Sequence, residues 1–312
     1  MRMTALILAV ALAGCAGREP LAPMRYIDAH SHILPDMPAA AEVAMLREAG
    51  LAQVVIMSPD PAGLREITAA GRGFVVPFIS IARLPDMAGY RLGADSAARF
   101  AELHAAGAVC GFGELPTRIE PATDPSDAAA LLHPHRMAIY READRLGLPV
   151  NMHIGLDAPE TIAAVERIAS GHPRMTLVLA HTGWSAGAAT IGRLMDAHAN
   201  IHADLSVRLD PAAGWPSPGG GAAVPAKITI LDADGVVRPD WRALILRHPN
   251  RFMFGMDITS AGGGRAGQAK LLLATARNAL GQLPRKVEAA VAHGNAERMI
   301  AGCAAKGVFG NP

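Results

Sequence analysis

Short runs of apolar residues alternate along most of the chain with longer segments in which apolar positions recur every three or four residues. The short runs have the length of buried β-strands, and the longer segments have the periodicity of amphipathic helices. The alternation repeats eight times from Tyr26 onward, and the expected strands span residues 26–33, 53–57, 74–82, 108–114, 149–153, 175–181, 200–206 and 251–257. Helices are expected between them, the clearest over 38–50, 94–106, 135–146, 159–170, 186–198 and 240–248.

Strands separated by helices pair in parallel, and eight such units predict an α/β fold, a (β/α)8 TIM barrel that forms a single domain. The alternative is a doubly wound open sheet. That fold needs a phosphate-binding Gly-x-Gly-x-x-Gly turn after a strand, and none of the expected strands is followed by one.

An insertion follows the seventh expected strand. Residues 210–225 are rich in proline and glycine, and Asp234-Gly235 between two apolar runs then predicts a β-hairpin. The βα loops of a barrel lie on its catalytic face. We therefore expect this βα-loop insertion either to cover the site as a lid or to form a surface hairpin beside it.

The N-terminus has the pattern of an export signal. Arg2 precedes an apolar run, residues 4–13, that is too short to span a membrane. Leu12-Ala13-Gly14-Cys15 resembles the lipobox of bacterial lipoproteins, which implies a signal peptide over 1–14, a lipidated Cys15, a short linker over 15–25 and the barrel over 26–312. An ordinary cleaved signal with an incidental Cys15 is the alternative. The lipobox predicts an exported bacterial lipoprotein, anchored to a membrane and facing the periplasm or the cell exterior.

The composition limits the kinds of molecule that the protein is expected to bind. The formal net charge is +1 and 51% of the residues are hydrophobic, so the chain lacks the basic balance of a nucleic-acid-binding protein and can bury a large core. A small-molecule substrate is expected instead. After export Cys110 and Cys303 could pair, but Cys110 lies within an apolar run, and we expect two small buried thiols.

Six side chains able to bind a metal stand at the ends of the expected strands one, four, five, six and eight: His30, His32, Glu114, His153, His181 and Asp257. His30 and His32 are two residues apart, so on a strand they project to the same face. The C-terminal ends of barrel strands converge on the catalytic face. Four imidazoles and two carboxylates suit Zn²⁺ and tolerate Mn²⁺ or Fe²⁺, so a divalent metal is expected, with Zn²⁺ favoured.

This order of residues resembles the amidohydrolase superfamily, over residues 26 to about 299. Members carry His-x-His after strand one, a bridging carboxylate on strand four, histidines after strands five and six, and an aspartate after strand eight. Many members have a carboxylated lysine on strand four, where this chain resembles the variants with a glutamate, Glu114. The closing Gly294-Asn-Ala-Glu-Arg298 is similar to the C-terminal helix of the amidohydrolase-related branch.

The resemblance implies a metal-dependent hydrolase that acts on a small ester, amide or lactone through a metal-activated hydroxide. Two divalent ions would leave the site net positive after Glu114, Asp257 and hydroxide are counted, whereas one ion would leave it net negative, so two are preferred over one per chain. Asp257 is the expected catalytic residue, which accepts the proton and passes it to the leaving group. The alternative for Asp257 is a metal ligand without that role.

Two other functions compete with hydrolysis. Decarboxylases of the same superfamily use a single zinc and need only the counterparts of His30, His32, His153 and Asp257, not Glu114. A non-enzymatic surface lipoprotein could keep the barrel as a binding scaffold, although the full ligand set disfavours this. The number of bound ions separates the first two, because two favour hydrolysis and one favours the lyase.

The substrate leaves weaker signals. Arg83, Arg118 and Arg208 follow strand ends and could bind a carboxylate or a phosphate, but we favour solvated charges at the rim. Trp184 and Trp215 fall in loops of the catalytic face, where they could form an apolar wall.

Overall fold

Eight strands form one sheet in the order β1 to β8, and each pairs in parallel with the next. The computed structural model describes residues 23–34, 36–81, 92–116, 126–184, 186–209, 228–258 and 265–304. The strands are β1 (Ile27–His32), β2 (Gln53–Ser58), β3 (Val75–Ile79), β4 (Gly111–Pro116), β5 (Pro149–His153), β6 (Thr176–Leu179), β7 (Ile201–Asp204) and β8 (Phe252–Met253).

The sheet closes on itself between β1 and the segment after β8. The amide of Ala29 donates to the carbonyl of Phe254 at 2.9 Å, and the amide of Asp257 donates to the carbonyl of His30 at 2.6 Å. These bonds give β1 a neighbour on both sides. The predicted single-domain (β/α)8 TIM barrel is confirmed.

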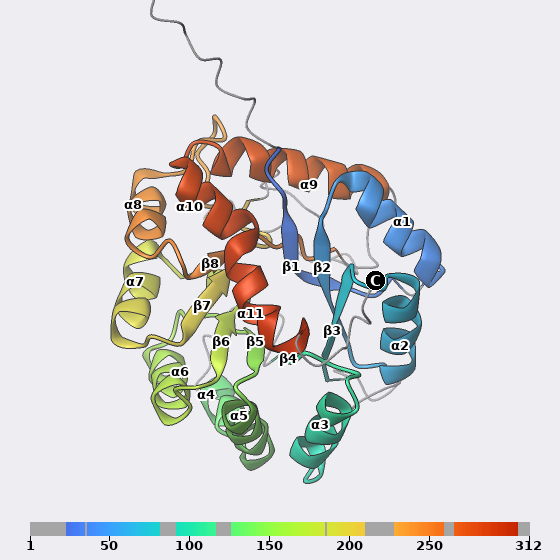
Figure 1. The fold of residues 1–312 in the computed structure, drawn as a ribbon. Helices are drawn as coiled ribbons and strands as arrows, with labels where there is room; N and C mark the ends of the chain where they lie inside the picture. The colour runs from blue at the N-terminus through green and yellow to red at the C-terminus, as the bar shows by residue number, and fades with distance from the viewer. Residues whose placement is uncertain are drawn as a thin grey trace, which may run out of the picture.

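The helices surround the strands (Figure 1). They are α1 (Ala39–Ala49), α2 (Pro61–Ala70), α3 (Ser96–Ala105), α4 (Ser126–Leu131), α5 (Pro134–Leu146), α6 (Pro159–Gly171), α7 (Ala188–Ala197), α8 (Pro239–Arg247), α9 (Arg265–Leu280), α10 (Arg285–Ala289) and α11 (Asn295–Ala304). Several begin with a proline, whose missing N–H costs nothing in the first turn. Helix α5 ends where Gly147 takes φ 67°, as the sequence predicts.

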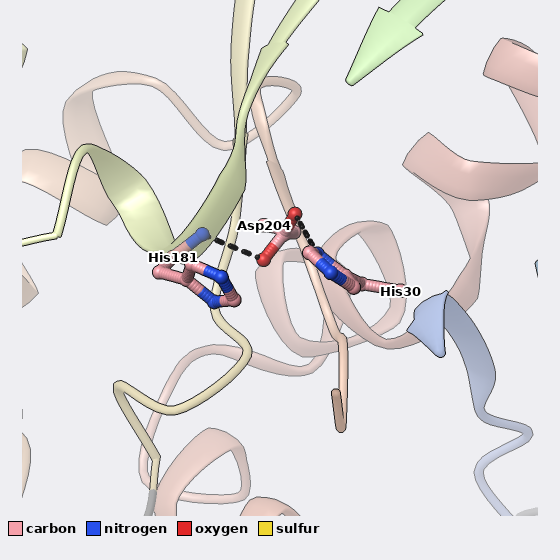
Figure 2. A group of neighbouring side chains, drawn as sticks. All are labelled: His30, His181 and Asp204. Atoms are coloured by element: carbon pink, nitrogen blue, oxygen red, sulfur yellow. Dashed lines mark hydrogen bonds and ion pairs between the residues drawn. The ribbon is translucent and has the colours of Figure 1, made fainter. Parts of the chain in front are cut away.

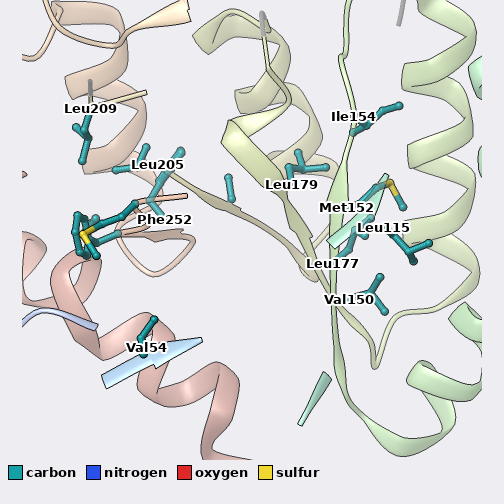
Figure 3. Close-up of a cluster of buried hydrophobic side chains, with 14 of the residues drawn as sticks. Val54, Leu115, Val150, Met152, Ile154, Leu177, Leu179, Leu205, Leu209 and Phe252 are labelled. Carbon is teal, nitrogen blue, oxygen red and sulfur yellow. The ribbon is translucent and has the colours of Figure 1, made fainter. Parts of the chain in front are cut away.

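Alternate residues of each strand face opposite sides. On β5, Val150 and Met152 point outward into the apolar layer beneath the helices, and Figure 3 shows them with neighbouring side chains of that layer. Asn151 and His153 lie between and after them in the sequence and therefore point into the barrel. The same strand therefore contributes to the apolar layer on its outer face and to the polar interior on its inner face.

Helix α11 closes the end of the barrel where the strands begin, and it lies over the middle of the ring in Figure 1. Its side chains Ile300 and Cys303 pack against inward-facing residues of β2 and β3. Cys303 forms a disulfide with Cys110, which directly precedes β4, and the two Cα atoms are 5.3 Å apart. The prediction of two thiols is therefore wrong. Both cysteines are buried as expected, but the fold brings α11 within bridging distance of β4.

The expected hairpin after the seventh strand reduces to one antiparallel bridge between Leu231 and Val237. Residues 210–227 of the insertion lie outside the described residues. So do the signal segment with Cys15, and Arg83, Arg118 and Trp215. Within the described ranges, none of the helices has the length and apolar character needed to cross a membrane.

Candidate metal centre

The carboxylate of Glu114, on β4, lies at the centre of the site and is only 2% exposed. Its Oε1 is 2.5 Å from Nδ1 of His153, 3.2 Å from Nε2 of His181 and 3.6 Å from Nε2 of His30. Its Oε2 is 3.7 Å from Nε2 of His32. One carboxylate therefore faces two pairs of imidazoles, one from β1 and one from β5 and the turn after β6.

Asp257 completes the β1 side of the site. It lies four residues beyond β8, with φ 53°, and its Oδ1 is 3.3 Å from Nε2 of His32 and 3.7 Å from Nε2 of His30. The structure thus brings all six residues singled out in the sequence together. Glu114 belongs to two groups of possible ligands, one with His30 and His32 and one with His153 and His181. Asp257 lies beside the first group.

Both carboxylates are ionised at neutral pH. Burial raises the pKa of Glu114, but His153 and, less strongly, the other imidazoles outweigh burial and hold that pKa well below its usual range. Burial also raises the pKa of Asp257, and the hydrogen bond with His32 together with the charges of the neighbouring histidines lowers it below its usual value. Metal ligands must be deprotonated, and both carboxylates meet this requirement.

The surroundings of His30 suit a cation. Its Nε2 is buried and has no hydrogen-bond partner among the described residues, although it faces Glu114 and Asp257. Burial lowers the pKa of His30, but the adjacent Asp204, followed by Glu114 and Asp257, raises it to about 10. A buried nitrogen that the surrounding carboxylates drive so strongly to take up positive charge is suited to a divalent cation. The residues present therefore fit a metal.

Sequence reasoning missed Asp204, the last residue of β7. Its Oδ2 is 2.9 Å from Nδ1 of His30 and accepts a hydrogen bond from Asn151 at 3.0 Å. Its Oδ1 accepts the backbone amide of His181 at 3.1 Å, and Figure 2 shows the carboxylate between the two histidines. Ser206 adds a 2.8 Å contact to Nδ1 of His181. Asp204 ends an apolar run as the six predicted residues do, and that was the available signal.

The side-chain oxygen of Asp204 is also close enough to ring nitrogens of His30 and His181 for the three to share a metal ion. We assign it to orienting the imidazoles, because it occupies Nδ1 of His30 and leaves Nε2 to face Glu114. Burial raises the pKa of Asp204, but His30 outweighs it and lowers the pKa to about 2, so the carboxylate stays charged. A carboxylate behind a ligating histidine fixes the ring and its tautomer.

The turn after β6 has an unusual backbone. His181, Thr182, Gly183 and Trp184 have φ values of 51°, 53°, 69° and 56°. Left-handed conformations cost roughly 1–2 kcal/mol for each residue other than glycine. The turn places the Trp184 ring 5.5 Å from the ring of His153 and 5.3 Å from that of His181, centre to centre. Trp184 thus lies beside the site, as its loop position predicts.

Arg208 was predicted to be a solvated charge at the rim, with binding of the substrate as the alternative, and the structure shows neither. It is 1% exposed and donates to four backbone carbonyls, those of His181 at 2.8 Å, Thr182 at 3.0 Å, Ala186 at 2.8 Å and Ile228 at 2.7 Å. Burial lowers its pKa to about 9, so it is still charged at neutral pH. The error arose because a turn after β6 and the segment after the insertion both fold over this side chain.

A protein-family model described as Amidohydrolase matches residues 27–301. The chain belongs to the amidohydrolase family. Two solved structures of an amidohydrolase from Burkholderia multivorans, one with bound HEPES and one with bound zinc, are 16% identical to this amidohydrolase. Each covers 89% of this chain and 99% of its own, with TM-scores of 0.51 and 0.53.

Dihydroorotase from Saccharomyces cerevisiae, solved with 5-fluoroorotic acid, is also 16% identical, and the match covers 89% of this amidohydrolase and 84% of that chain with a TM-score of 0.55. At these identities the structures show a shared fold. None of the curated proteins matches the chain. Family membership and the His, Glu and Asp cluster identify an enzyme of the metal-dependent hydrolase class.

Proposed function

We propose that this amidohydrolase hydrolyses a small ester, amide or lactone at a centre of two divalent ions, with Zn²⁺ favoured. His30, His32 and Asp257 would hold one ion, His153 and His181 the other, and Glu114 would bridge them. The central observation is the position of Glu114, whose Oε1 lies within 3.6 Å of nitrogens from both groups of histidines.

Bound divalent ions would lower the pKa of a water molecule and polarise the carbonyl oxygen of the substrate. Asp257 would act as the general base and then as the general acid. The side chains of Asp257 and His32 are 21% and 22% exposed to solvent. Those of Glu114 and His30 are buried. The reacting groups therefore meet the substrate on the Asp257 side, where an ionised carboxylate can take the proton of the attacking water and return it to the leaving group.

Metal content tests the proposal. Purified wild-type protein should hold about two ions per chain, as paired-metal hydrolases do. Glu114→Ala should retain about one, because His30, His32 and Asp257 remain while the second pair of histidines loses its carboxylate, and hydrolysis of a panel of small esters, amides and lactones should collapse. Glu288→Ala is the matched control, since it removes a buried carboxylate of α10 that pairs with Arg285 away from the site.

Unchanged metal content and rate in Glu114→Ala would exclude a bridging role for this carboxylate. A wild-type protein with a single ion that releases CO₂ from carboxylic acids would instead be a lyase.

We also propose that the protein is an exported lipoprotein anchored through Cys15. The disulfide between Cys110 and Cys303 supports export, because such bonds persist in oxidising compartments and are rare in the cytosol. This support is independent of the lipobox residues.

A further inference from the structure

The turn after β6 carries two residues of the site on an unfavourable backbone. His181 faces Glu114, and Trp184 lies against His153. Thr182 is β-branched and Trp184 is bulky, and such residues keep positive φ only where the surrounding structure holds them. The contacts that hold this turn therefore determine where His181 and Trp184 lie.

Asp204 holds the turn from the side of the barrel interior. Its carboxylate accepts the amide of His181, and its backbone carbonyl accepts the hydroxyl of Thr182 at 2.6 Å. These two bonds fix the first half of the turn. Within the turn the carbonyl of His181 accepts the amide of Trp184 at 3.1 Å, and the carbonyls of Thr182 and Ala186 take their partner from outside it.

Arg208 binds the turn from the other side and adds a second donor to the carbonyl of His181. Nε donates to the carbonyl of His181, and Nη2 donates to the carbonyls of Thr182 and Ala186. One planar guanidinium thus spans both ends of the turn on either side of Trp184. Its remaining Nη1 donates to Ile228, which joins the turn to the segment after the insertion.

The guanidinium is itself held in place. Its Cζ lies 5.0 Å from the ring of Trp241, a fully buried side chain of α8. A buried side chain with Nε, Nη1 and Nη2 all engaged by backbone carbonyls is turned away from any substrate. Its effect on the reaction must therefore act through the turn.

We propose that Arg208 is a positioning residue, which holds the turn after β6 so that His181 faces Glu114 and Trp184 lies against His153. This inference rests on the proposed metal centre for its effect on catalysis. Its effect on the turn does not depend on any metal.

The geometry also requires arginine at this position. A lysine carries the same charge, but its ammonium is a single point with three donors and cannot reproduce the planar fork that reaches carbonyls at both ends of the turn. Arg208→Lys should therefore hold the turn more firmly than Arg208→Gln does, and less firmly than the wild type.

The experiment compares Arg208→Gln and Arg208→Lys with the wild type and with Arg251→Gln. Arg251 is a matched control, because Nη1 of its guanidinium also donates to two backbone carbonyls, those of His198 and Ile201, at the opposite end of the barrel. The first readout is hydrogen–deuterium exchange of the peptide covering residues 180–187 in metal-free protein. The second is the affinity for the second ion, measured by competition with a chelator.

Arg208→Gln should speed exchange selectively in this peptide. It should also lower the affinity for the second ion by about 10–100-fold, the usual effect of losing a residue that orients a ligand. Arg208→Lys should fall between, and Arg251→Gln should leave both readouts unchanged. Wild-type exchange in Arg208→Gln, or equal acceleration in Arg251→Gln, would overturn the proposal. Failure of the wild type to bind a second ion would reject the two-metal function alone, because the exchange readout contains no metal.

Discussion

At the scale of single residues, two imidazoles of the site are held by one nitrogen and present the other. His30 has Nδ1 on Asp204 and Nε2 toward Glu114, and His181 has Nδ1 on Ser206 and Nε2 toward the same carboxylate. An ionised carboxylate at Nδ1 of His30 holds a proton there, so a cation that displaces the proton of Nε2 would bind the lone pair of that nitrogen. Asp204 and Ser206 thus orient the two imidazoles so that their Nε2 atoms face Glu114.

Asp257→Asn tests the proton carrier. Asparagine keeps an oxygen near His32 but cannot accept a proton, so metal content should be largely retained while kcat falls by about 10²–10⁴-fold. Steady-state kinetics on the best substrate of the ester, amide and lactone panel, at equal metal loading, measure the effect. A variant with near-wild-type kcat would leave Asp257 as a ligand only.

The lowered pKa of His202 makes the stability of the fold depend on pH. Burial, followed by the charges of Arg251 and Arg298, lowers the pKa of this β7 side chain to about 4, and its Nδ1 has no hydrogen-bond partner within the described ranges. The unfolded chain takes up the proton near pH 6.5, so between pH 6.5 and about 4 the unfolded state binds more protons and the folded state loses stability as pH falls.

The contribution of His202 is on the order of 3 kcal/mol at full effect. In urea unfolding, His202→Gln should therefore lose less stability than the wild type between pH 7 and pH 5. His198→Gln, a change three residues before β7, serves as the control. Equal pH slopes in wild type and His202→Gln would show that His202 is not protonated differently in the two states.

At the scale of elements, the strand boundaries show what periodicity can predict. Strand β5 spans the five residues expected from Pro149 to His153. The expected eighth strand stops early, at Met253, because the following amides bond elsewhere: that of Met256 donates to the side chain of Asp28 at 2.9 Å. Strand β6 ends before His181 because its turn adopts positive φ. Both departures occur where the chain leaves the sheet to build the site.

Helix α11 is the element that the disulfide fixes. The bond joins positions 193 residues apart in the sequence, so it restricts a long loop of the unfolded chain. We expect the double variant Cys110→Ser/Cys303→Ser to lose about 2–5 kcal/mol of unfolding free energy. Metal content should be unchanged, because the bond lies where the strands begin and the site where they end.

Thermal unfolding with and without a reductant measures this effect, and the serine variant, which has nothing to reduce, is the control. Thiol titration of the denatured wild type gives an independent check. Free thiols at both Cys110 and Cys303 would contradict the disulfide.

At the scale of the whole molecule, the barrel and the convergence of the six side chains could be predicted because both follow from one rule. Eight alternating units give the ring, and side chains at the strand ends converge. Asp204 and Arg208 could not be assigned in this way, because their roles depend on partners from other strands: His30 for Asp204, and the turn at His181 for Arg208. The cysteine pair was missed for the same reason.

The anchor proposed at Cys15 is also a property of the whole molecule. Cys15→Ser should block lipidation, so the protein should accumulate as an unprocessed precursor and leave the detergent phase of a membrane extraction. Labelling with a fatty-acid analogue measures this directly. An unlabelled wild type would refute the anchor.

Arg25, near the start of the described chain, forms an ion pair with Glu297 of α11. The chain therefore enters the barrel on the face that α11 closes, and the candidate metal site lies at the far ends of the strands. If Cys15 is lipidated, the stretch from Cys15 to Pro23 can extend at most about 30 Å. The lipid would then keep the end of the barrel that α11 closes near the bilayer, and the catalytic face at the other end would be open to the aqueous side.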